Sequence, residues 1–208
     1  MSLDTFDNLV KEIVSWSHRG DLGTKINDFI QLAENAMYSN EAEVLTVRSM
    51  EIVSTALTAG QYLQLPDDFE SARSVRLVTG DNGGELTYQA PEQMFKQVST
   101  GRPNFFTIVG NELQFDRVPD SSYTIEIQYF RKAAALTLLN QTNEILTSHP
   151  SIYLFGSLAA LNAFTQDTEQ QSKYTQMFIS AIKGANKADK KGRHGPAPSM
   201  SIDCGMIV

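Results

Sequence analysis

The stretch SHPSIYLFGSLAALNAFTQDTEQQSKYTQMFISAIKGANKADKK, from Ser148 to Lys191, predicts two consecutive helices and decides the fold. Ser148 and Pro150 are typical of a helix start, because a serine oxygen can cap a free backbone N–H and proline is tolerated in the first turn. Asp167 predicts the start of the second helix, since its carboxylate can cap the N–H of Gln170. The first segment is apolar on nearly every side, so we expect its helix to be buried.

The second of these helices is amphipathic, and its carboxyl end is basic. Its apolar residues recur at spacings of three and four, whereas polar residues fill the other side. Gly192 is the expected helix stop. The basic residues near this end are Lys183, Lys187, Lys190, Lys191 and Arg193. Ordinary helix chemistry accounts for them, since the helix dipole favours cations there, and a basic docking site is the alternative.

The beginning of the chain also predicts helices. A helical stripe of apolar residues runs from Phe6 to Trp16 after Thr5, a good N-cap. Thr24 is the expected cap of a second helix that ends near Asn40. In this second helix, the pattern predicts that Leu32 faces the core and that Glu34 faces mostly outward. We therefore expect helices at both ends of the chain.

Strands and turns are expected between the terminal helices. The glycine-rich residues 80–84 predict a hairpin, and Gly110-Asn111 predicts another whose first turn residue is glycine, as a type II′ turn requires. Residues 91–98 are expected to form a short helix. Residues 123–130 alternate apolar and polar side chains and form the clearest strand pattern. The fold class is therefore α+β, with terminal helices packed as an α-helical bundle, an inserted antiparallel β-rich region and an extended C-terminal tail.

The domain organisation follows from these patterns. We expect N-terminal helices in residues 1–43, the β-rich insertion in 44–142, C-terminal helices in 143–191 and the extended tail in 192–208. The tail is rich in glycine, proline and serine, so it cannot propagate a helix, yet it ends in the apolar run Met206-Ile207-Val208. Such an end favours insertion into a partner protein, and a frayed terminus without function is the alternative.

The charge distribution argues against a DNA-binding protein. The 208 residues include 17 basic and 24 acidic ones, for a net charge of −7. Five basic residues and one acidic residue lie between Lys183 and Arg193, which leaves 12 basic and 23 acidic residues, or −11, in the remainder. Because the rest of the chain is so acidic, it would repel the phosphate backbone of DNA. This argues against sequence-specific DNA binding.

The sequence also argues against membrane, disulfide and metal chemistry. It contains no run of 18 apolar residues and no signal-peptide pattern at its start, so we expect a cytoplasmic location. Cys204 is the single cysteine, which excludes an internal disulfide and cysteine metal clusters. The three histidines do not lie at metal-site spacings. Asp67, Asp68 and Glu70 suit a turn better than acid–base catalysis.

Four short motifs carry a resemblance to a known family. They are Leu65-Pro66-Asp67-Asp68-Phe69, the hairpin end Leu113-Gln114-Phe115 before the Pro119-Asp120 turn, Tyr129-Phe130-Arg131, and His149-Pro150-Ser151-Ile152-Tyr153-Leu154 before an alanine-rich helix. With the order of the elements from about Leu3 to Lys190, they resemble the head-to-tail adaptor proteins of tailed bacteriophages.

The resemblance implies a noncatalytic structural subunit. Such subunits form a ring, of twelve copies, that joins the portal of the DNA-filled head to tail or nozzle proteins. DNA passes through the channel without specific binding, and the acidic body of this chain suits such a channel. The protein would be assembled in the host cytoplasm and reside in the virion at the head–tail junction, with no cofactor, metal or membrane. The residues expected to dock on the portal are Lys187, Lys190, Lys191, Arg193, Ile202, Met206, Ile207 and Val208.

Two other functions compete with this hypothesis. One is a tail-associated cell-wall (peptidoglycan) hydrolase, because two carboxylates suffice for glycoside cleavage. Against it, no glutamate in the sequence stands in an apolar context that would raise its pKa. The other is a free-standing cytoplasmic oligomer or scaffold, which predicts no affinity for a portal ring.

Overall fold

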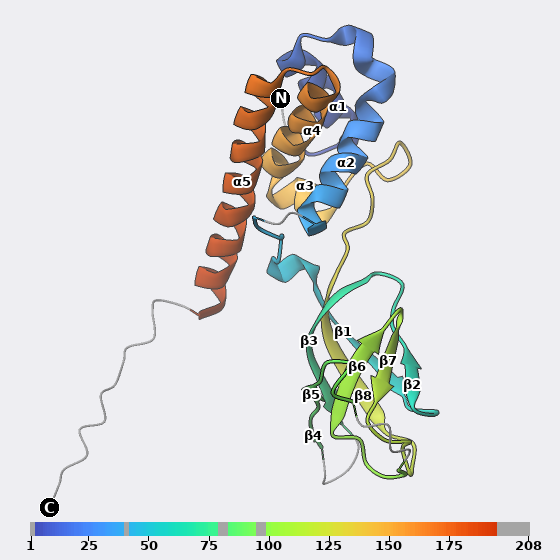
Figure 1. The fold of residues 1–208 in the computed structure, drawn as a ribbon. Helices are drawn as coiled ribbons and strands as arrows, with labels where there is room; N and C mark the ends of the chain where they lie inside the picture. Colours follow the sequence, from blue (N-terminus) through green and yellow to red (C-terminus); the bar gives the residue numbers. More distant parts are fainter. Residues whose placement is uncertain (1–2, 40–41, 79–82, 95–98, 195–208) are drawn as a thin grey trace, which may run out of the picture. The chain divides into compact units, whose positions relative to one another are not determined.

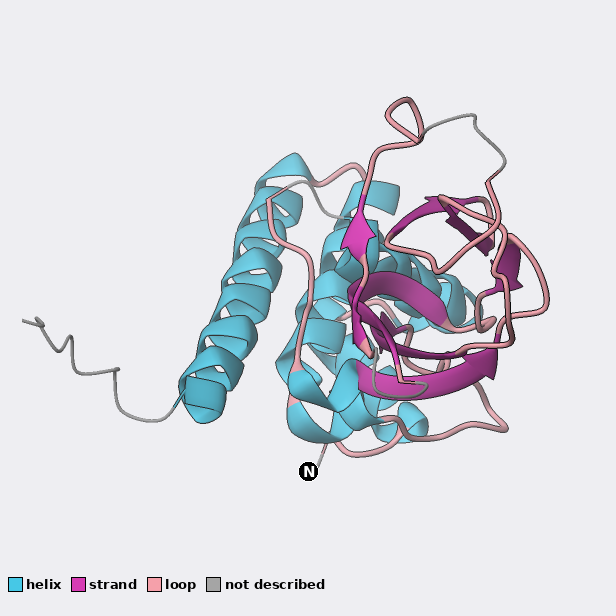
Figure 2. Ribbon diagram, turned by 90° about the horizontal axis from the view of Figure 1, so that it is seen from below, coloured by secondary structure: helices cyan, strands magenta, loops and turns pink. Residues whose placement is uncertain are grey.

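Helices and strands lie in separate parts of this chain. The computed structural model describes residues 3–39, 42–78, 83–94 and 99–194. The chain divides into two compact units, Met1–Ser49 with Ala134–Val208, here the helical unit, and Met50–Ala133, here the strand unit. All described strands belong to the strand unit, and the described α-helices belong to the helical unit (Figure 2). The predicted α+β class is confirmed.

The helical unit is organised around one buried helix (Figure 1). This helix, α4 (Pro150–Phe164), packs against α1 (Phe6–Ser17), α2 (Ile26–Ser39) and α5 (Thr168–His194). Its buried residues occur around most of its circumference, as the sequence predicted: Ile152, Tyr153, Leu154, Gly156, Ser157, Leu158 and Leu161. The unit also contains the short helix α3 (Glu144–Ser148) and the 3₁₀ helix η1 (Gly20–Lys25). A second 3₁₀ helix, η2 (Arg48–Met50), spans the boundary between the units.

Two of the predicted helix caps are confirmed. The Thr5 hydroxyl accepts a hydrogen bond of 3.3 Å from the N–H of Asn8. The Asp167 carboxylate accepts one of 3.1 Å from the N–H of Gln170. Both side chains satisfy donors that have no partner inside their helices.

Three other predictions of helix ends are wrong. Ser148 is the last residue of α3 and does not cap α4, whose N-cap is His149. The stronger cap is Asn143, which accepts from the N–H of Leu146 at 2.8 Å and starts α3. Thr24 lies inside η1, because a turn of 3₁₀ helix precedes α2. Helix α5 continues through Gly192 to His194, since a glycine lowers helix stability without ending a helix.

Gly156 allows three helices to approach one another closely. A Cβ atom at this position would lie 2.8 Å from the Cβ of Ala33 on α2 and 3.0 Å from Cε2 of Phe178 on α5. The first distance is shorter than real Cβ atoms tolerate. Glycine at this position therefore sets the spacing of α2, α4 and α5.

Gly156→Ala is expected to destabilise the protein by about 1–3 kcal/mol, the usual cost of overpacking a core, although alanine is the better helix former. The matched control is Gly184→Ala on α5, where no atom lies within 4 Å of the added Cβ. This control is expected to gain about 0.5–1 kcal/mol. Chemical denaturation of both variants measures the difference, and equal effects would contradict the close approach at Gly156.

The strand unit consists of two sheets around one core. The first has the order β1 (Glu51–Leu57), β8 (Thr124–Arg131), β3 (Phe69–Leu77) and β4 (Gly84–Glu85), and every pair is antiparallel. The second has the order β2 (Tyr62–Gln64), β7 (Glu112–Phe115), β6 (Phe105–Val109) and β5 (Thr87–Tyr88), with β5 and β6 parallel. Strands of both sheets and residues next to them supply the core: Leu65, Val75, Leu77, Leu86, Phe106, Leu113, Phe115, Ile125, Ile127 and Tyr129.

The predicted hairpins are present where the structure describes them. Val109 pairs with Glu112 across Gly110, whose φ of 62° fits the type II′ turn that was predicted. Strands β3 and β4 pair antiparallel, whereas residues 79–82 of their connection lie outside the described residues. Residues 91–94 form a turn, and the remainder of the short helix predicted for 91–98 lies outside the described residues.

Two of the four motifs meet in the strand unit. The Tyr129 hydroxyl donates a hydrogen bond of 2.9 Å to Asp68, and the rings of Tyr129 and Phe69 are 5.5 Å apart. Burial and the neighbouring Asp68 raise the pKa of Tyr129 to about 12. Glu70 forms an ion pair with Lys132 at 3.1 Å. These acidic residues thus hold the turn between β2 and β3 to the end of β8.

Candidate docking surface at the end of helix α5

Helix α5 presents a row of lysines opposite its buried face. Phe178, Ile182 and Ala185 are buried. The exposed lysines, by contrast, include the pairs 183/187, 187/190 and 187/191 at spacings of three and four, which places them on one stripe: Lys183, Lys187, Lys190 and Lys191. Like charges at such spacings destabilise a helix by a few tenths of a kcal/mol per pair, and the helix dipole offsets part of this cost. The stripe is therefore suited to an anionic partner.

The residues predicted to dock do not share one environment. Lys187, Lys190 and Lys191 are exposed on the stripe. Arg193 instead turns toward its own helix, where its Nε donates to Asp189 at 2.6 Å and its side chain is only 15% exposed. Ile202, Met206, Ile207 and Val208 lie outside the described residues. The structure thus groups the three lysines and gives Arg193 a structural contact.

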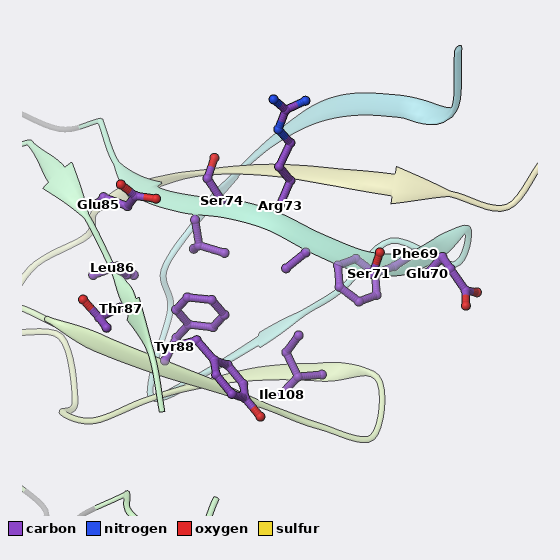
Figure 3. A pocket seen from close by; sticks show the side chains of 13 residues that line it. Phe69, Glu70, Ser71, Arg73, Ser74, Glu85, Leu86, Thr87, Tyr88 and Ile108 are labelled. Atoms are coloured by element: carbon purple, nitrogen blue, oxygen red, sulfur yellow. The ribbon is translucent and has the colours of Figure 1, made fainter. Parts of the chain in front are cut away.

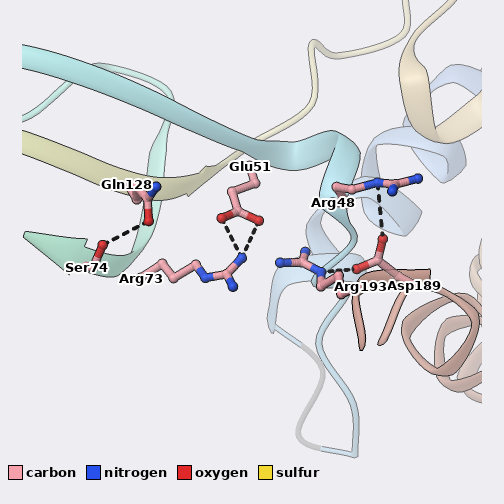
Figure 4. A network of polar contacts seen from close by, with 7 residues as sticks. All are labelled: Arg48, Glu51, Arg73, Ser74, Gln128, Asp189 and Arg193. Carbon is pink, nitrogen blue, oxygen red and sulfur yellow. Dashed lines mark hydrogen bonds and ion pairs between the residues drawn. The ribbon is translucent and has the colours of Figure 1, made fainter. Parts of the chain in front are cut away.

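Asp189 is the centre of a small charged cluster on the helical unit (Figure 4). Besides Arg193, it lies 4.0 Å from Nε of Arg48. Burial opposes the ionisation of Asp189, but the hydrogen bonds from Arg193 and the backbone of Arg48 prevail and lower its pKa. A groove of about 340 Å³ beside the cluster is also lined by His149, whose pKa is lowered by burial and raised in part by Asp189.

Asn186 fixes the segment that leaves α2 to the same helix. Its Oδ1 accepts from the N–H of Thr46 at 2.9 Å, and its Nδ2 donates to Glu43 Oε1 and to the carbonyl of Val44, both at 2.8 Å. The side chain is 4% exposed. We name these contacts the Asn186 clamp. The sequence contains one signal for it, since Asn186 follows Ile182 by four residues and thus occupies a core-facing position.

A second buried polar network joins α2, α3 and α4. The Tyr153 hydroxyl donates to Glu34 at 3.1 Å and accepts from Nδ2 of Asn143 at 2.7 Å. Glu34 also accepts from the N–H of Leu136 at 2.8 Å. Burial raises the pKa of Glu34, and these two hydrogen bonds lower it in part. Burial, followed by the charge of Glu34, likewise raises the pKa of Tyr153.

This network corrects two predictions. Glu34 was expected to face outward, and no glutamate was expected in a context that raises its pKa. Both expectations are wrong. Tyr153 and the backbone of Leu136 donate hydrogen bonds that offset the free-energy cost of burying the carboxylate. Leu32 was expected to face the core, but its side chain is 54% exposed. Periodicity alone did not show which residues of α2 meet a neighbour.

An open cavity lies in the strand unit (Figure 3). Its volume is about 620 Å³, and β3, β5 and β6 provide most of its lining. Phe69, Tyr88 and Ile108 form an apolar surface, whereas Arg73 and Glu85 lie at β3 and β4 (Figure 3). Arg73 forms an ion pair with Glu51, and Ser74 donates to Gln128 at 3.0 Å (Figure 4). The polar side chains beside the cavity therefore brace strands of the first sheet.

The described residues contain no cluster of three or more His, Cys, Asp or Glu side chains that could hold a metal ion. Within the same residues, none of the helices has the length and apolar character needed to cross a bilayer.

Comparison with known families identifies the type of protein. The family model described as SU10 adaptor protein matches residues 4–198, which is most of the chain. The chain belongs to the SU10 adaptor family. This adaptor is thus a structural protein of a phage, and it associates with other head or tail proteins of the particle. No curated protein matches the adaptor.

The family match covers both units of the adaptor and all four motifs. The resemblance to head-to-tail adaptors is confirmed. The lysine stripe also lies within the matched residues, and so does the Asn186 clamp. Membership agrees with a noncatalytic role for the adaptor.

Proposed function

We propose that this adaptor forms a ring, of twelve copies, that joins the portal of the DNA-filled head to the tail. The family match carries this proposal, because it extends over residues 4–198. In the ring, the terminal helices pack as a bundle beside those of neighbouring copies, and the strand-rich insertion faces tail or nozzle proteins. The protein thereby resides in the virion at the head–tail junction.

The docking surface for the portal consists of the lysine stripe and the tail that follows it. Lys187, Lys190 and Lys191 are exposed and lie on one side of α5. The tail continues directly from this helix and ends in an apolar run. Basic residues steer the encounter with an acidic partner surface, and burial of the apolar end then stabilises the complex.

The channel of the ring is proposed to conduct DNA without binding it. Outside the segment from Lys183 to Arg193, acidic residues outnumber basic ones by 23 to 12. An acidic lining repels phosphates, and so it keeps DNA from adhering as it passes. In this arrangement, the basic segment contacts the portal protein and not the DNA.

No observation favours the hydrolase alternative. Among the glutamates that the structure describes, Glu34 is the one whose pKa is raised by burial, as a general acid would require. Its oxygen, however, accepts hydrogen bonds from Tyr153 and from the backbone of Leu136. The raised pKa therefore belongs to a structural contact.

Electron microscopy of the adaptor mixed with portal rings tests the proposed function. The expected result is a second ring of twelve adaptor copies on one face of each portal, with tail proteins able to bind the opposite side. Adaptor that leaves portal rings undecorated at saturating concentration, or that decorates them as isolated subunits without a ring, would contradict the proposal.

A further inference from the structure

A rigid turn holds two leucines in solvent on the helical unit. The turn spans residues 135–141, here the leucine turn, and follows the last strand of the strand unit. The N–H of Thr137 donates to the carbonyl of Asn140, the N–H of Asn140 donates to Oγ1 of Thr137, and both distances are 3.0 Å. The Asn140 side chain also donates to the carbonyl of Ala135 at 2.8 Å. The turn is thus closed by its own hydrogen bonds.

The helical unit anchors both ends of the leucine turn. At one end, Leu136 is buried and its N–H donates to Glu34 at 2.8 Å. At the other, the carbonyl of Gln141 accepts from the N–H of Phe6 at 2.7 Å, and its side chain accepts from the N–H of Asp7 at 3.2 Å. The turn therefore has a fixed position beside α1 and α2, as Figure 1 shows for the loop next to α2.

The leucines at the tip of this turn are mostly exposed in the single subunit. Leu138 is 68% exposed and Leu139 is 100% exposed. A groove of about 400 Å³ runs between them and the residues Asn27 and Gln31 of α2. Because leucine gains stability from burial, a turn built to expose two of them is suited to an apolar contact.

A second exposed apolar surface lies on the opposite flank of α2. At 100° per residue, Phe29 lies about 160° around the helix from both Asn27 and Gln31. The ring of Phe29 is 5.7 Å from that of Phe164, which is 53% exposed, and Lys25 lies over the Phe164 ring at 5.5 Å. We call Leu32, Phe164 and Lys25 the aromatic face, since Leu32 is on this flank and is also exposed.

We propose that the leucine turn of one adaptor copy packs on the aromatic face of the next copy. The two surfaces differ in shape, because one is a groove walled by leucines and the other carries an aromatic side chain able to enter it. Their edges differ in charge, since Asp7 lies beside the leucine turn and Lys25 belongs to the aromatic face. Two different patches on opposite flanks give a head-to-tail contact, which closes into a ring when the rotation permits.

This inference rests on the proposed ring and names the interface that would build it. A self-complementary dimer would need one patch to meet itself. Among the residues that line the groove beside Leu139, the one aromatic side chain is Phe6, which is buried. The contact lies wholly on the helical unit, so it does not depend on the strand unit.

Cysteine cross-linking of the full chain tests the contact. In a Cys204→Ser background, Leu139→Cys and Leu32→Cys are purified separately, mixed at high concentration and oxidised. The expected result is a covalent dimer in the mixture and little in either variant alone, whereas the doubly substituted chain gives a ladder of oligomers. Leu57→Cys is the matched control, because Leu57 is also well exposed, at 64%, but lies on β1 of the strand unit. Dimers from one variant alone, or no more product than with Leu57→Cys, would overturn the inference.

A second measurement separates this interface from the proposed function. Leu139→Ser is expected to weaken self-association by about tenfold or more, the change that loss of one buried leucine brings, while Leu57→Ser leaves it unchanged. Analytical ultracentrifugation gives the association constants, and circular dichroism confirms that both variants fold. If Leu139→Ser self-associates as strongly as the unsubstituted adaptor, and the unsubstituted adaptor forms rings on the portal, the interface is disproved and the proposed function stands. Absence of rings from the unsubstituted adaptor would refute the proposed function itself.

Discussion

Removal of residues 195–208 is expected to abolish attachment of the adaptor to the portal and to leave its melting temperature nearly unchanged. The core residues that the structure describes all precede residue 195, and the described helix α5 spans Thr168–His194. The removed segment contains the apolar run that is proposed to insert into the portal. The truncation begins after His194 because Arg193 pairs with Asp189, so an earlier cut would remove a structural contact.

Charge reversal on the lysine stripe provides the second arm of this experiment. Lys187→Glu with Lys191→Glu is expected to slow association with the portal and to weaken it by about tenfold or more at low salt. The matched control is Lys11→Glu with Lys173→Glu, which changes the net charge equally at exposed positions on α1 and near the start of α5. Surface plasmon resonance on immobilised portal measures both rates. Full binding by the truncated adaptor, or equal loss in the control, would show that docking occurs elsewhere.

Asn186→Ala is expected to lower the free energy of unfolding by about 2–4 kcal/mol, since the change leaves several buried groups without partners. The substitution removes all three hydrogen bonds of the clamp, including the one from the backbone N–H of Thr46. Leu45, which lies between Val44 and Thr46, is buried, so water cannot readily replace the lost hydrogen bonds along this segment.

Asn162→Ala on α4 is the control for the clamp. The Asn162 side chain donates to the carbonyl of Leu158, one turn earlier in its own helix, so its removal breaks a local contact. We expect a loss below about 1 kcal/mol, because alanine also forms helix better than asparagine. Urea denaturation of both variants is the measurement. A loss for Asn186→Ala that is no larger than for Asn162→Ala would mean that the clamp contributes little.

Local sequence signals predicted much of the fold. The cap at Thr5, the cap at Asp167 and the turn at Gly110 depend on atoms within a few residues, and the structure confirms them. Periodicity also predicted the buried helix α4 and strand β8 correctly. The errors concern positions where distant residues decide. Glu34 is half-buried because Tyr153, which follows it by 119 positions, supplies a donor.

The candidate docking surface was predictable only in part. The lysines of α5 could be found from charge and helical spacing, because both are properties of one segment. The role of Arg193 could not, since its pairing with Asp189 competes with any outward contact. The Asn186 clamp and the leucine turn also escaped prediction. Both depend on which backbone groups from other segments approach a side chain, and no periodic pattern encodes that approach.

The first and last long strands of the strand unit are partners in one sheet, and they pair from Glu51 with Phe130 to Leu57 with Thr124. The chain therefore enters and leaves this unit at neighbouring points, about one strand spacing apart. The strand unit, Met50–Ala133, is thus connected to the helical unit in the way that a surface loop is connected to a domain, with its two ends close together. A change of length or sequence inside it leaves the ends of the connection where they were. Evolution can thus exchange the module that is proposed to meet the tail, while the helices that are proposed to build the ring stay the same.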